Sequence, residues 1–209
     1  MTGGFRKGRT ENTRSYKKLY LIASEGKKTE KSYFIKNICC LIDKENIAIK
    51  FIDTPDSAPC NVLAVFQDAI KKEDNHLRKG DEAWIVIDRD TWPEDAIREV
   101  YQWTQTRPND KLHRDMALSN PCFEYWLLLH YEDGSNTSTV NDCKGRLKKH
   151  LTLINNNVPE GTFNREHVEQ AIKRAKTIKE KTWGETQQPI TAGHIGTTVY
   201  RLVEKLLES

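Results

Sequence analysis

Two carboxylates separated by a single residue, Asp88 and Asp90, directly follow an apolar run over residues 83–87. The run is rich in β-branched side chains and lacks a helical period, which is typical of a strand buried on both faces of a parallel sheet. Side chains two residues apart in an extended segment point the same way, so both carboxylates could face one point at the strand's carboxyl end, where α/β sheets bind ligands. Such hard oxygen ligands suit Mg²⁺ or Mn²⁺, and Arg89 between them could contact a phosphate group.

The Asp-x-Asp triplet alone does not establish a metal site, because aspartates also build loops and helix caps. A further carboxylate, Glu25, follows the expected strand at residues 18–24 in the same structural position. A short strand expected at residues 116–119 ends at Asn120 and leads into a helix with Glu124 in its first turn. Glu124 has an equally good structural explanation, since a carboxylate there complements the helix dipole. Three strand ends are thus expected to carry Glu25, the pair Asp88 and Asp90, and the pair Asn120 and Glu124 to one sheet edge.

Strand and helix patterns alternate through the first 130 residues, which predicts a parallel sheet with right-handed crossover connections. Beyond residue 139 the apolar spacing predicts helices that form a C-terminal extension packed on the sheet. We therefore expect an α/β fold with about four parallel strands and flanking helices. The expected strands cover residues 18–24, 47–52, 83–88 and 116–119, and the expected helices cover residues 27–42, 62–70, 93–103, 121–130, 140–153, 165–181 and 195–207.

Particular residues are expected to start three of these helices. Asn61 would cap the helix that begins beside it, because a side-chain amide can accept from the free backbone N–H groups of the first turn. Pro93 would open the next helix, since proline is tolerated in a first turn. In the same way, Asn120 would cap a helix whose first residue is Pro121.

Composition limits the classes of protein to which the chain can belong. With 30% charged and 37% hydrophobic residues and no apolar run of about 18 residues, no membrane span is expected. No signal-peptide pattern opens the chain, so we expect a cytoplasmic protein. The five cysteines include no Cys-x-x-Cys and are read as reduced thiols, and the six histidines lack metal-ligand spacing, so no zinc site is expected.

Basic residues gather in two segments. Residues 1–18 contain six basic residues and one acidic residue, and residues 144–181 contain ten basic residues and four acidic ones. Each run taken singly is equally well explained as a solvated surface, but two such runs around a metal-like centre favour nucleic acid as the partner. Residues 1–16 have almost nothing apolar to bury. The expected organisation is a flexible basic arm over residues 1–16, an α/β core over 17–131 and a helical extension over 132–209.

The acidic elements carry a resemblance to known families. Glu25-Gly26 after the first strand and Asp88-Arg89-Asp90 after a later one resemble the characteristic elements of the Toprim domain, the metal-binding fold of topoisomerases, primases and OLD-family nucleases. More closely, the chain from about residue 17 onward resembles the RloB family, of which the Asn-Pro-x-Phe-Glu-x-Trp block is the most specific element. Ser24 departs from the pattern, where many members carry cysteine. The stretches that carry the closer resemblance are residues 22–34, 87–90, 119–130 and 197–203.

The resemblance implies a Toprim-like core and an Mg²⁺- or Mn²⁺-dependent nuclease that cleaves DNA or RNA, including tRNA, in anti-phage defence by abortive infection. Glu25 would be a metal ligand or proton-transfer group, and Asp88 and Asp90 would be metal ligands. Lys27, Lys28 and Arg89 would contact phosphate, while no chemical role is assigned to Asn120 and Glu124. An ATPase encoded alongside is a candidate partner, and nucleases of this kind often act as homodimers.

Two other functions are compatible with parts of the sequence. A non-catalytic Toprim module could bind nucleic acid or nucleotide, or sense a phage component, while a partner protein acts. A phosphatase of the haloacid dehalogenase type also uses Asp-x-Asp at a strand end. It is disfavoured because its nucleophile usually follows the first strand and because Trp92 stands where such enzymes have threonine or valine.

Overall fold

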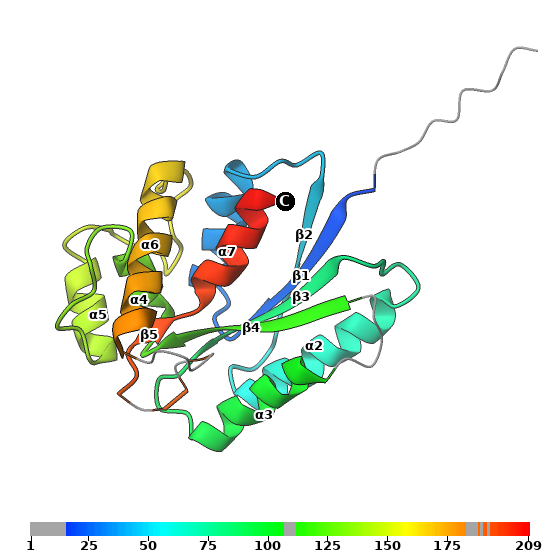
Figure 1. The fold of residues 1–209 in the computed structure, drawn as a ribbon, viewed down its shortest axis with the longest axis horizontal. Coiled ribbons are helices and arrows are strands. Elements are labelled where there is room, and N and C mark those ends of the chain that lie inside the picture. The colour runs from blue at the N-terminus through cyan, green and yellow to red at the C-terminus, as the bar shows by residue number, and fades with distance from the viewer. Residues whose placement is uncertain (1–15, 107–111, 183–187, 189, 192) are drawn as a thin grey trace, which may run out of the picture.

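The computed structural model describes residues 16–106, 112–182, 188, 190–191 and 193–209. Its centre is a five-stranded sheet in the order β2-β1-β3-β4-β5, in which β1 to β4 are parallel and the short β5 runs antiparallel to β4 (Figure 1). This confirms the expected α/β class with a mostly parallel sheet. The strands are β1 Lys18–Ser24, β2 Ile47–Ile52, β3 Asp81–Asp88, β4 Leu112–Asn120 and β5 Gly196–Thr197.

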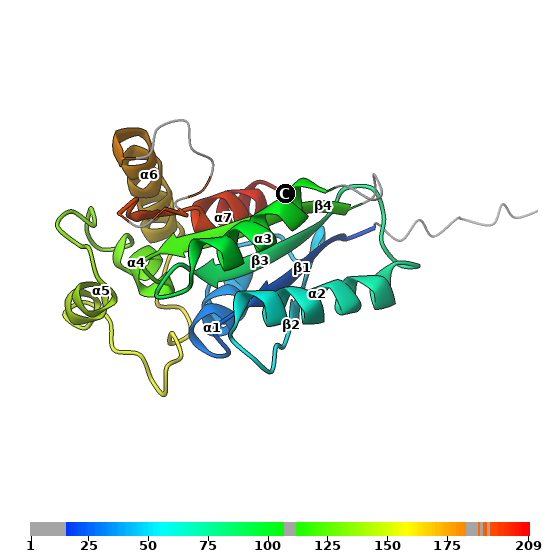
Figure 2. The same ribbon diagram turned by 90° about the horizontal axis from the view of Figure 1, so that it is seen from below.

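Seven α-helices flank the sheet in the described part of the chain, and a 3-10 turn, Ile38–Cys40, follows the first of them. Helices α2 and α3 lie side by side on one face, while α1 and α7 cover the other (Figures 1 and 2). Helices α4, α5 and α6 gather beyond the end of the sheet at which β4 ends (Figure 1). The helices are α1 Thr29–Lys36, α2 Pro59–Glu73, α3 Glu94–Gln105, α4 Phe123–Leu128, α5 Val140–Leu147, α6 Arg165–Thr182 and α7 Val199–Glu208.

Strands β1 and β3 are buried on both sides, as their continuous apolar runs predict. Tyr20 and Trp84 pack into the core under α1 and α7, whereas Leu21 and Ile85 pack against α2 and α3. Because β1 leads to a helix on one face and its neighbour β3 leads to a helix on the other, the chain diverges between these two strands. Such a topological switch point leaves a crevice at the carboxyl ends of the strands, where α/β proteins bind ligands.

The first two expected strands coincide with β1 and β2, but several helix starts differ. Helix α2 begins at Pro59 with Ala58 at the N-cap, because the Asn61 amide instead donates to Asp56 Oδ2 at 2.7 Å. Pro93 is the N-cap of α3 and has extended backbone angles. Asn120 ends β4 rather than capping a helix, and α4 begins only at Phe123.

Other elements also begin or end at residues that differ from those expected. Strand β4 starts at Leu112, α5 ends at Leu147, and the two-residue β5 replaces the expected first turn of the last helix. Most of the expected basic arm lies outside the described residues, but its last residue, Tyr16, donates a hydrogen bond to Asp81. No helix within the described residues is both long and apolar enough to cross a membrane.

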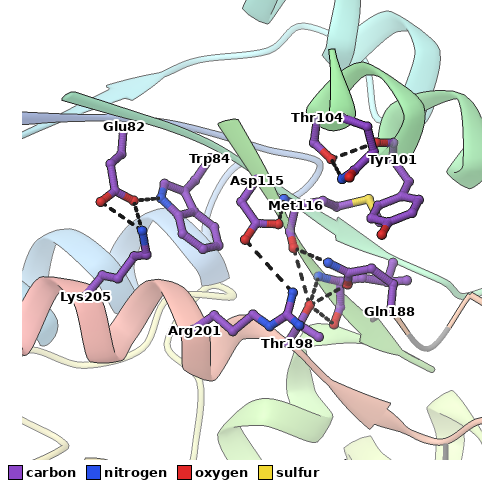
Figure 3. A network of polar contacts seen from close by, with 12 residues as sticks. Glu82, Trp84, Tyr101, Thr104, Asp115, Met116, Gln188, Thr198, Arg201 and Lys205 are labelled. Atoms are coloured by element: carbon purple, nitrogen blue, oxygen red, sulfur yellow. Dashed lines mark hydrogen bonds and ion pairs between the residues drawn. The ribbon is translucent and has the colours of Figure 1, made fainter. Parts of the chain in front are cut away.

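Polar side chains tie α7 to the sheet (Figure 3). Lys205 forms an ion pair with the buried Glu82 at 3.0 Å, and Glu82 also accepts from the Trp84 indole at 2.9 Å. At the other end of α7, Thr198 Oγ1 donates to Gln188 Oε1 at 2.7 Å and accepts from the backbone N–H of Leu118 at 3.0 Å. The helix is therefore held by specific polar contacts in addition to its apolar face.

Replacing Thr198 by valine keeps the shape of the side chain but leaves two buried polar groups, the Leu118 N–H and the Gln188 oxygen, without this partner. We expect the free energy of unfolding in urea to fall by about 2 to 3 kcal/mol. Thr182→Val, at the exposed end of α6, is the matched control and should cost less than about 0.5 kcal/mol. Equal losses for the two variants would contradict a structural role for the Thr198 hydroxyl.

Candidate active site

The loop after β3 places the Asp-x-Asp pair. Strand β3 ends at Asp88, and the chain then turns, with the N–H of Arg89 donating to Ser119 O at 2.7 Å and that of Asp90 donating to Pro121 O at 2.8 Å. Asp90 has a φ of 32°, in the left-handed region that non-glycine residues seldom adopt. The extended geometry from which both carboxylates were expected to face one point is therefore absent, because the strand ends at Asp88, two residues before Asp90. Asp90 is exposed on this turn.

Glu25 leaves the end of β1 and is held against the loop after β3. Its Oε2 accepts a hydrogen bond from the Asp88 backbone N–H at 3.3 Å, and its Oε1 accepts one from the Trp92 indole at 2.9 Å. Burial raises the pKa of Glu25 above the ordinary value, and the nearby Asp90 carboxylate raises it further against the lowering effect of the two donors. Glu25 is consequently oriented by its neighbours and disposed to exchange a proton closer to neutral pH.

Asp88 and Glu30 lie in the same acidic cluster. Burial raises the pKa of Asp88 well above its usual range, and the carboxylates of Glu30, Glu25 and Glu124 raise it further. Burial likewise raises the pKa of Glu30 to about 7, with contributions from Glu124 and Glu25. Asp88 Oδ1 is buried and has no hydrogen-bond partner among the described residues. We call Glu25, Glu30, Asp88 and Glu124 the carboxylate cluster; it concentrates negative charge that a cation would stabilise.

Gly26 makes room for one member of this cluster. A Cβ atom on Gly26 would stand 1.9 Å from Glu30 Oε2, far inside contact distance. Any larger side chain would therefore push the Glu30 carboxylate out of its buried position. The Glu25-Gly26 pair therefore provides a carboxylate at the end of β1 and leaves space beside it for the carboxylate of Glu30.

A pocket of about 850 Å³ opens beside the carboxylate cluster. Glu30 and Glu124 line its acidic part, and Glu124 forms an ion pair with Lys144 at 3.6 Å. Lysines from two distant parts of the chain and three leucines line the rest. These residues are Lys27, Lys28, Lys144, Lys148, Leu147, Leu151 and Leu153.

Two of the expected site residues make other contacts. Arg89 donates through Nε to Ile190 O at 2.8 Å, which fastens the loop to the C-terminal part of the chain, and through Nη1 to Trp92 O within the loop itself. Asn120 is buried, and its amide donates to Thr191 O at 3.2 Å. The phosphate contact expected of Arg89 stays a prediction, with fewer N–H groups left to make it.

The side chains of the carboxylate cluster determine whether a divalent cation fits the site. No three His, Cys, Asp or Glu side chains in the described part of the chain are arranged as a ready set of metal ligands. Mg²⁺, however, is commonly held by one or two carboxylates together with water and substrate phosphate. The unpartnered, buried Asp88 oxygen and the mutual repulsion within the carboxylate cluster fit that mode. Asp88 and Glu25 are the residues that would hold the ion.

Several participants were missed by the sequence reasoning. The sequence pattern places Glu30 only at the start of a helix, although it lies within the stretch that resembles the RloB family. Lys144 and Lys148 were counted in a basic run but not placed at the site. The spacing of four residues between them, which puts them on one side of a helical segment, is the signal that could have linked them. No sequence pattern indicates that Trp92 contacts Glu25.

The fold and site define an α/β protein with buried carboxylates at a topological switch point and a lysine-lined pocket beside them. Over residues 20–206 the chain matches the family described as RloB-like protein, and it belongs to that family. This confirms the resemblance found in the sequence. No curated protein and no solved structure is detectably similar to the chain.

Proposed function

We propose that this RloB-like protein is a Toprim-type nuclease that uses Mg²⁺ or Mn²⁺ to hydrolyse phosphodiester bonds in DNA or RNA, tRNA included, as part of cytoplasmic anti-phage defence. The observation that carries the proposal is the partial burial of Glu25 and Asp88 at the ends of adjacent parallel strands, with raised pKa values and a buried, unpartnered oxygen on Asp88. Buried like charges at a crevice are costly for folding, and they are useful where a cation or a proton is handled.

The described residues have distinct tasks in this proposal. A bound divalent ion would stabilise charge on the phosphate oxygens. Asp88 and Glu25 would hold it, and Glu25, fixed through both carboxylate oxygens, could also take a proton from the attacking water. Lys27 and Lys28 at the pocket would orient the phosphate backbone. Asp90, exposed on the adjoining turn, remains a candidate third ligand.

The test is to incubate the purified chain with plasmid DNA and with total tRNA in Mg²⁺, in Mn²⁺ and in EDTA. Cleavage that requires the divalent ion is the expected result and identifies the substrate. Absence of cleavage of both substrates in every metal would contradict the proposal for the isolated chain.

One observation favours the non-catalytic function, in which the chain binds nucleic acid or senses phage while a partner such as an ATPase acts. The described carboxylates do not form a ready set of ligands for a metal. This function predicts binding of nucleic acid with a steep salt dependence and no cleavage with any divalent ion. The same incubations, followed by a binding titration, separate the two functions.

Trp92 is expected to act as a positioning residue through its hydrogen bond to Glu25. Trp92→Phe keeps an aromatic ring at this partly buried place but removes the N–H donor. We expect the Mg²⁺ concentration for half-maximal cleavage to rise about 10- to 100-fold, as is usual when a partner of a metal ligand is lost. Trp103→Phe, in the same apolar core, is the matched control. Identical metal dependence in both variants would show that the indole N–H does not orient Glu25.

A further inference from the structure

The pocket beside the carboxylate cluster has two walls from distant parts of the chain. One wall is the loop after β1 with the start of α1, and the other is α5 with the segment after it. Thr29 Oγ1 donates to Asn156 O at 2.9 Å, and the N–H of Val158 donates to Ser32 Oγ at 2.8 Å. These bonds fasten the second wall to α1, so the pocket is a built feature of the fold.

The lysines of the pocket differ in their contacts. Lys144 pairs with Glu124, and Lys27 Nζ donates to Pro55 O at 2.8 Å. The ammonium groups of Lys28 and Lys148 have no hydrogen-bond or ion-pair partner among the residues that the structure describes. Two uncompensated cations, one on each wall, are therefore available to an anionic ligand.

Several other cations of the basic run from residue 144 to 181 have partners outside the pocket. Arg146 pairs with Glu132, Lys176 pairs with Glu204, and Arg174 donates to Leu129 O. These contacts hold helices together and partly satisfy the charges. Within the described residues, Lys144 and Lys148 are the members of this run that line the pocket beside the carboxylate cluster.

The volume of the pocket and the side chains that line it limit the class of ligand that it can bind. A volume of about 850 Å³ is within the range of sites for small molecules and is far too small for a double helix. Leu147, Leu151 and Leu153 offer an apolar surface for a base, and lysines on both sides offer partners for the flanking phosphates. No aromatic side chain among the described residues lines the pocket, so base stacking on a ring, the usual source of sequence-tolerant affinity, is not available there.

We propose that this pocket receives unpaired nucleotides, so that the substrate class of the chain is single-stranded nucleic acid and Lys28 and Lys148 grip its backbone from opposite walls. The inference rests on the proposed function, because it places the strand beside the carboxylates expected to act on it. Binding is mainly electrostatic and weakly dependent on sequence. A paired stretch must open, or present a loop, before it enters.

The test measures binding in EDTA, so that it does not depend on cleavage. Fluorescein-labelled oligo-dT, oligo-U and a duplex of equal length are titrated with the full chain at several salt concentrations. We expect at least one of the single strands to bind more tightly than the duplex, because the pocket is too small to admit a double helix. In the double variant Lys28→Gln/Lys148→Gln, the slope of log affinity against log salt concentration should become smaller in magnitude by about 1.4. Each lost phosphate contact on a single strand contributes about 0.7 to that slope.

Lys72→Gln, an exposed lysine on α2 across the sheet, is the matched control and should leave binding unchanged. Thermal melts show whether each variant is folded. Equal or tighter binding of the duplex, or an unchanged salt slope in a folded double variant, would overturn the proposal. Cleavage is scored separately, so single-strand binding without cleavage would contradict the proposed nuclease and leave this inference standing.

Discussion

Asp88→Asn is expected to abolish divalent-dependent cleavage while leaving the fold intact. Asparagine has nearly the same shape but cannot supply the anionic oxygen that Asp88 offers at the end of β3. Loss of a ligand that places a metal against the scissile phosphate removes several kcal/mol of charge stabilisation, so the rate should fall at least about 10³-fold. The measurement is initial cleavage rate in saturating Mg²⁺.

The same variant should be at least as stable as the parent chain without metal at about pH 8. Burial and three neighbouring carboxylates raise the pKa of Asp88, so its charged form is unfavourable in the folded state and its removal relieves repulsion. Asp95→Asn, exposed on α3, is the control for activity and stability. An active Asp88→Asn variant would refute the metal site, whereas an unfolded one would show that Asp88 is structural.

Glu30→Gln is expected to remove a pH-dependent loss of stability. Because burial raises the pKa of Glu30 from 4.5 to about 7, the folded chain holds a proton there that the unfolded chain releases. Stability from this group is therefore fully present below about pH 4.5 and is lost as the pH rises through about 7. At about pH 8 the parent chain carries the buried charge and the glutamine variant does not.

We expect the two chains to have similar free energies of unfolding at about pH 5, and the variant to be more stable by up to about 3 kcal/mol at about pH 8. Urea titrations in EDTA across this range measure the difference. Glu160→Gln, on an exposed loop, should follow the parent chain at every pH. A constant offset between Glu30→Gln and the parent chain would mean that Glu30 titrates normally and that neither its burial nor the neighbouring carboxylates raise its pKa.

Much of the sheet could be predicted because its determinants are local. A continuous apolar run is enough to indicate a strand buried on both faces, and β1 and β2 begin and end where the runs do. The residue at which each run ends also predicts which polar side chain lies at the carboxyl edge of the sheet. This is why Glu25 and Asp88 could be placed there from the sequence. Helix starts were less predictable, since Asn61 and Asn120 make contacts with residues that are distant or outside the helix.

The sequence by itself determined the class of fold, the family, and three of the carboxylates at the sheet edge, because periodicity and strand ends are properties of short segments. Only the tertiary structure decided that Glu30 joins them, that the strand stops before Asp90, and that Lys28 and Lys148 face one pocket. The two lysines come from elements far apart in the chain, and no local pattern specifies how those elements pack. That both lysines line one pocket is set by the packing of α5 and the segment after it against α1.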